Sequence, residues 1–111
     1  MTITTNGTAL IGYTDKGYTL EAIGAALRGA SDGDVEMYTA DDFFDGKVTI
    51  EFVAKINGTT VTIYNYKPDA ADVQAMLDGD YEWHVGGFSK DVVNVLNAIG
   101  IDSRLRPGLG N

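Results

Sequence analysis

The feature that most constrains the fold is an Asn57-Gly58 pair between two segments of strand-like sequence. Residues 47–56 alternate between polar and apolar side chains, which is the pattern of a half-buried strand. Residues 59–66 are rich in Thr, Val, Ile and Tyr, which strands prefer. Because Asn-Gly accepts the positive φ angles of a type I′ turn, the sequence predicts a β-hairpin here.

Helix signals lie on both sides of this hairpin. Thr19 is a candidate N-cap for a helix that stops near Gly29, and Ser89 is a candidate N-cap for one that stops near Gly100. Asp69 caps a shorter predicted helix. Further strands are expected at 8–13 and 81–85, and an irregular acidic loop at 31–45.

This order predicts an α+β domain, with an antiparallel sheet of three to four strands and two to three helices packed on one face. Residues 1–102 are expected to form this single domain, and residues 103–111 a flexible C-terminal tail.

Acidic residues dominate the charge. The chain carries 16 acids against 8 bases, a formal net charge of −8. Such a field repels duplex nucleic acid and anionic lipid and attracts a basic partner, although acids also simply maintain solubility. No apolar run is long enough to cross a bilayer, and no secretory signal or cysteine is present, so we expect a reducing cytoplasm.

The acidic loop is the first candidate binding surface. Its carboxylates are predicted to contact a basic surface of a partner protein; they are Asp32, Asp34, Glu36, Asp41, Asp42 and Asp45. The alternative is a solvated loop without a partner. The spacing Asp32, Asp34, Glu36 resembles the opening of a calcium loop, but the required glycine and closing Glu are missing, so no metal site is predicted.

A second candidate is a small-ligand site for a nucleotide-like molecule. Tyr64, Tyr66 and Trp83 would stack on a base. Gly86-Gly87, before the helix capped by Ser89, would receive phosphates together with Lys67 or Lys90. The alternatives are that the aromatic residues line the edge of the core and that the glycines form a tight turn.

His84 is the only histidine, and it gives the chain its one candidate catalytic base. No Gly-x-Ser-x-Gly motif surrounds any serine, and no partner for a general base is indicated. We therefore expect a binding protein without a cofactor. Catalysis through His84 is the third hypothesis, and His84 is otherwise grouped with the ligand-binding residues.

Three segments carry a resemblance to known proteins. They are Lys47-Val-Thr-Ile-Glu-Phe, Val61-Thr-Ile-Tyr-Asn-Tyr-Lys67 and Glu82-Trp-His-Val-Gly-Gly87, and a helix from Ser89 to Ile99 follows them. Over roughly residues 18–99 this pattern resembles a group of small bacteriophage-encoded proteins of unassigned function. Asn65 stands where that group is expected to have Asp. The resemblance implies a phage accessory protein in the bacterial cytoplasm. Because such proteins often act on host machinery, we expect that it occupies a basic surface of a host protein and so inhibits host defence or assists host takeover.

Overall fold

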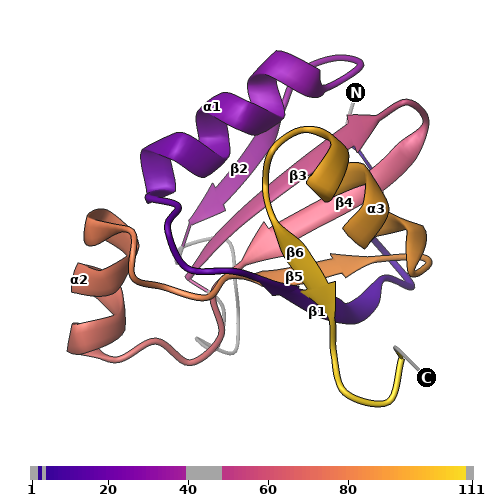
Figure 1. Ribbon diagram of the computed structural model, residues 1–111. Helices are drawn as coiled ribbons and strands as arrows, with labels where there is room; N and C mark the ends of the chain where they lie inside the picture. Colours follow the sequence, from indigo (N-terminus) through magenta and orange to yellow (C-terminus); the bar gives the residue numbers. More distant parts are fainter. Residues whose placement is uncertain (1–2, 4, 40–48, 110–111) are drawn as a thin grey trace.

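The computed structural model describes residue 3 and residues 5–39 and 49–109, and it shows an α+β protein (Figure 1). In this part of the chain six antiparallel strands form one sheet in the order β2-β3-β4-β5-β1-β6. The strands are β1 (Ala9–Thr14), β2 (Glu36–Thr39), β3 (Ile50–Ile56), β4 (Thr59–Tyr64), β5 (His84–Gly87) and β6 (Ser103–Leu105). The predicted class is confirmed, but the predicted number of three to four strands is too small.

The two strands that the sequence did not predict lie at opposite edges of the sheet. β2 lies inside the segment expected to be an acidic loop, and it pairs with β3. β6 begins the segment expected to be a tail, and it pairs with β1. Asn97 holds β6 in place, because its side chain accepts from Ser103 N at 2.6 Å and donates to Ser103 O at 3.2 Å.

The predicted hairpin is confirmed as β3 and β4. Its register runs from Glu51 opposite Tyr64 to Ile56 opposite Thr59. The turn residues Asn57 and Gly58 have φ angles of 51° and 82°, both in the left-handed region that a type I′ turn requires.

The three predicted helices are present as α1 (Leu20–Ala30), α2 (Ala70–Asp78) and α3 (Asp91–Ala98). Thr19 caps α1 by accepting from Ala22 N, and Asp69 closes a capping box with Asp72 at the start of α2. At α3 the N-cap is Lys90 rather than Ser89, whose hydroxyl accepts from Asp91 N at 3.3 Å. None of the described helices is long and apolar enough to cross a membrane.

One side of the sheet packs on the helices, with α1 and α3 lying across it (Figure 1). We call this side the helix face. All three helices and the strands β3, β4 and β5 contribute to its buried core, which includes Ile23, Leu27, Phe52, Ile63, Met76, Trp83, Val85, Val92 and Leu96. Alternation then directs the remaining strand side chains to the opposite side.

Candidate functional site

The side of the sheet opposite the helices carries a continuous row of polar and aromatic side chains. Directly paired residues of antiparallel strands share a face, and the pairings connect one residue from each strand. In the order of the sheet these residues are Tyr38, Glu51, Tyr64, His84, Tyr13 and Arg104. We call this side the tyrosine face, and His84 lies near the middle of its row.

His84 is surrounded by tyrosine rings. Its ring centroid lies 5.2 Å from that of Tyr13, 5.5 Å from that of Tyr64 and 5.9 Å from that of Tyr66. Burial lowers the pKa of His84, although the nearby Glu82 carboxylate acts in the opposite direction. The imidazole is therefore neutral at pH 7.

The two ring nitrogens of His84 have different environments. Nδ1 is buried, and it is the one buried side-chain nitrogen or oxygen in the described part of the chain without a hydrogen-bond partner. We assign the proton of the neutral ring to Nε2, because an N–H at Nδ1 would be buried without an acceptor. The ring then presents an N–H donor through the half that is not enclosed.

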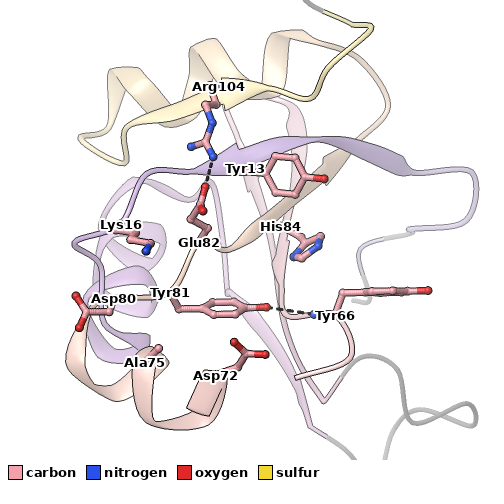
Figure 2. Close-up of a pocket in the computed structure, with 10 residues that line it drawn as sticks. All are labelled: Tyr13, Lys16, Tyr66, Asp72, Ala75, Asp80, Tyr81, Glu82, His84 and Arg104. Carbon is pink, nitrogen blue, oxygen red and sulfur yellow. Dashed lines mark hydrogen bonds and ion pairs between the residues drawn. The ribbon is translucent and has the colours of Figure 1, made fainter. Parts of the chain in front are cut away.

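His84 lines a cavity of about 480 Å³ on the tyrosine face, which we call the first cavity (Figure 2). This volume lies in the range of small-molecule sites. The cavity is lined by four rings, five charged residues and one alanine, namely Tyr13, Tyr66, Tyr81, His84, Lys16, Asp72, Asp80, Glu82, Arg104 and Ala75.

Tyr81 forms one wall of the first cavity and is held firmly. It is only 8 % exposed, and its ring packs edge-on against Trp83 at a centroid distance of 5.2 Å. Its hydroxyl accepts from Tyr66 N at 3.4 Å (Figure 2). Since the oxygen is engaged as an acceptor, the hydroxyl hydrogen remains available to a ligand.

Arg104 closes another side of the first cavity, and its charge is already paired. Its guanidinium donates to Asp15 at 2.9 Å and also to Glu82, and it lies over the Tyr13 ring. Lys67 likewise lies over the Tyr66 ring, 5.5 Å from its centroid. These cations stabilise the rings, but the pairing of Arg104 leaves it poorly suited to bind a phosphate.

A second cavity of about 280 Å³ lies on the same face and shares Tyr66 with the first. We call it the second cavity. It is bordered by Glu51, Thr62, Tyr64 and Gly86, and by residues 8–10 at the start of β1. Two cavities therefore meet at one exposed tyrosine ring.

Asn65 explains why Tyr64 and Tyr66 are held at this junction. Its side chain is fully buried, and its Oδ1 accepts from Thr49 N at 2.8 Å and Ile50 N at 3.1 Å. Its Nδ2 donates to Thr49 Oγ1 and contacts Met76 Sδ at 3.5 Å. An aspartate here would lose both of the donated contacts, so the amide suits this site.

The structure brings together only part of the predicted ligand-binding set. Tyr64, Tyr66, Gly86 and His84 border the two cavities, and Lys67 lies over one of the rings. Trp83 does not join them, because it lies on the helix face, fully buried, with Nε1 donating to Tyr18 O at 3.1 Å. The prediction that Trp83 belongs to the stacking surface is therefore wrong; alternation along the strand separates it from His84.

The predicted phosphate site at Gly86 and Gly87 is also corrected. Both glycines lie within β5 and not at a helix N-terminus. A Cβ on Gly87 would lie 2.3 Å from Val92 Cγ2, and one on Gly86 would lie 2.4 Å from Thr62 Oγ1. The glycines are thus required by close packing, and Lys90 lies beyond them as the exposed N-cap of α3.

The predicted acidic partner surface divides into residues with different roles. Asp32 accepts from Asn57 N and Gly58 N at 2.8 Å each, which clamps the hairpin turn and lowers the pKa of its carboxyl group. Glu36 accepts from Ile3 N and from the Tyr38 hydroxyl, both at 2.8 Å. Asp34 is exposed. The other three members, Asp41, Asp42 and Asp45, lie outside the described residues.

The arrangement around His84 is not that of an activated catalytic base. Within the described residues, no carboxylate or hydroxyl is hydrogen-bonded to its ring, and no three acidic or histidine side chains are grouped to hold a metal ion. The expectation that the protein acts without catalysis stays a prediction.

Several residues of the two cavities were not predicted from the sequence, among them Tyr13, Glu51, Tyr81 and Arg104. Glu51 lies within a predicted strand, but its neighbours were unknown without the strand order. Tyr13 was placed in a strand without its register, and Arg104 was placed in a tail.

No known protein family, no curated protein and no solved structure matches the chain. The resemblance to phage-encoded proteins therefore stays a prediction.

Proposed function

We propose that the protein binds a flat, uncharged ring, such as a nucleoside base or an aromatic side chain, in the first cavity. The observation that carries this proposal is a cavity of about 480 Å³ lined by three tyrosine rings and a neutral imidazole. Aromatic walls favour planar ligands, and base stacking on one such ring contributes about 1–3 kcal/mol. Tyr66 is 42 % exposed and is the ring on which we expect the ligand to stack.

The polar groups of the first cavity define the edge of the ring that they recognise. The Tyr81 hydroxyl and the Nε2–H of His84 both donate, whereas the Asp72 and Asp80 carboxylates accept. A ring with acceptors on one edge and donors on another satisfies both sets, as nucleobases do. Purely hydrocarbon rings would bind more weakly.

Electrostatics argues against a phosphorylated ligand in this cavity. Three acids and two bases line it, and one of those bases, Arg104, is already paired with Glu82. The whole chain carries a net charge of −8, so an anionic ligand would approach against a repulsive field. We therefore place a nucleoside ahead of the corresponding nucleotide.

The test is a thermal-shift and calorimetric panel of nucleosides, their monophosphates and aromatic amino-acid amides. A ligand at 100 times its dissociation constant should stabilise the protein by about 2.7 kcal/mol. We expect uncharged rings to bind, and Tyr66→Ala to weaken them while Phe88→Ala, a 54 % exposed ring outside both cavities, leaves them unchanged. Absence of binding by every ring would overturn the proposal.

Binding of a basic surface on a host protein is a second proposal. It is supported by the net charge of −8 and by the exposure of Asp34. Association that weakens steeply as salt is added would support it, and association indifferent to ionic strength would remove it. A phage origin and a cytoplasmic location are parts of this second proposal.

A further inference from the structure

The second cavity contains a carboxylate without a partner. Glu51 is half-buried, and within the described part of the chain its carboxylate takes part in no hydrogen bond or ion pair. By contrast, Asp32, Glu36, Asp72 and Glu82 all accept a hydrogen bond. A half-buried carboxylate that lacks a hydrogen-bond donor has lost part of its hydration free energy without compensation. A ligand that supplies a donor restores part of that free energy on binding.

The surroundings of Glu51 provide no positive charge to compensate its carboxylate within the described residues that line the second cavity. Burial raises the pKa of its carboxyl group, because the site has lost water without gaining a cation. Burial, and to a smaller extent the charge of the Glu51 carboxylate, raises the pKa of Tyr64 to about 12. None of the described residues that line the second cavity is basic.

The position of Glu51 relative to the first cavity sets the size of a shared ligand. Glu51 and His84 belong to the same row and are separated by one strand, so their backbones lie roughly 10 Å apart at about 4.8 Å per strand. Tyr66 lines both cavities. A ring stacked on Tyr66 therefore lies within the reach of a short flexible chain from the Glu51 carboxylate.

We infer that the ligand combines an aromatic ring with an aliphatic ammonium group, and that Glu51 binds the ammonium in the second cavity. This inference rests on the proposed function, since the ring occupies the first cavity. It adds the chemical class of the ligand: an arylalkylamine, or a peptide in which an aromatic residue lies close to a lysine. The acidic net charge would draw such a cation toward the protein.

The experiment compares indoles that carry a primary amine on an ethyl, butyl or hexyl chain with the alcohols of the same length. We expect at least one amine to bind about tenfold or more tightly than its alcohol in calorimetry, as a charge-assisted hydrogen bond provides. Glu51→Gln should abolish this gain. Glu21→Gln, which removes the same charge from the exposed surface of α1, should preserve it.

A measurement on the unaltered protein keeps the inference testable if Glu51→Gln fails to fold. The side-chain carboxyl carbon of Glu51 should shift in the NMR spectrum when the amine is added, and should shift much less with the alcohol. A Trp-Lys peptide and its acetyl-lysine form distinguish a peptide source from a small molecule, since only the free lysine form should depend on Glu51.

The two proposals fail in different ways. If neither alcohols nor amines bind, the ring site itself is absent and the proposed function falls. If the alcohols bind and the amines gain nothing, or if the gain survives Glu51→Gln, the ring site stands and the role of Glu51 is refuted.

Discussion

The two faces of the sheet are built from the same strands, but one face forms the core and the other forms the candidate binding surface. In and just before β5, Trp83 and Val85 point to the helix face and are fully buried, whereas His84 and Gly86 point to the tyrosine face. The neighbouring strand repeats this division, with Ile63 on the helix face and Tyr64 on the other. A strand period of two thus allows one segment to supply both the core and a binding surface.

The faces also differ in how their polar groups are satisfied. Polar atoms near the helix face have partners: Trp83 Nε1 donates to Tyr18 O, and Asn65 makes four contacts. On the tyrosine face, His84 Nδ1 is buried without a hydrogen-bond partner. The Glu51 carboxylate also lacks a hydrogen-bond partner within the described residues. Unsatisfied groups cost stability, so their concentration on one face indicates that this face is shaped for something other than stability.

The largest expected effect tests the helix face. Trp83→Ala should lower the free energy of unfolding by about 3–5 kcal/mol, because it leaves a large cavity and removes the hydrogen bond to Tyr18. Urea denaturation followed by circular dichroism measures the change. A loss below about 1 kcal/mol would mean that this face is not the stabilising one.

A smaller effect is expected at Gly87, where the backbone of β5 approaches α3. Gly87→Ala should cost about 1–3 kcal/mol, because the new methyl group would lie 2.3 Å from Val92 Cγ2. The double variant Gly87→Ala, Val92→Ala should be less destabilised than the sum of the two single changes. Simple additivity in denaturation experiments would contradict the proposed contact.

The parts of the fold that the sequence predicts are those with local signals. Local signals were sufficient for the Asn57-Gly58 hairpin and for the Thr19 and Asp69 caps, because each rests on a few adjacent residues. The strands β2 and β6 have only four and three residues, and partners distant in sequence stabilise them. Segments so short carry too little pattern of their own to be recognised.

The site was predictable only where one strand determined it. Tyr64, Tyr66 and His84 were identified, but Trp83 was added to them although it precedes His84 and so points the opposite way. Tyr13 and Arg104 join His84 only through pairings across the sheet. The order β4-β5-β1-β6 is a tertiary property, and no spacing in the sequence encodes it locally.

The tyrosine face is expected to lose binding without losing stability. Tyr66→Ala should change the free energy of unfolding by less than about 1 kcal/mol, because the side chain is 42 % exposed. It should remove about 1–3 kcal/mol of binding free energy for a stacked ring. Denaturation and calorimetry on the same sample measure both quantities, and a large stability loss would place Tyr66 in the core instead.

The smallest effect concerns the pH dependence that His84 gives to stability. Burial lowers its pKa in the folded protein below the usual 6.5, so the unfolded chain takes up a proton first as the pH falls. The free energy of unfolding should therefore be highest above pH 6.5 and should decline below it, until the pH passes the folded pKa. His84→Gln removes this titration while keeping a polar side chain.

The difference in unfolding free energy between the two proteins isolates His84 from the carboxylates that also titrate in acid. This difference should be constant above pH 6.5, and below that pH the unaltered protein should lose stability relative to His84→Gln. If the unaltered protein instead gains stability relative to His84→Gln, Glu82 outweighs burial and holds the ring as a cation. His84 would then donate from both nitrogens, and its cationic ring would repel the ammonium ligand that we assign to this face.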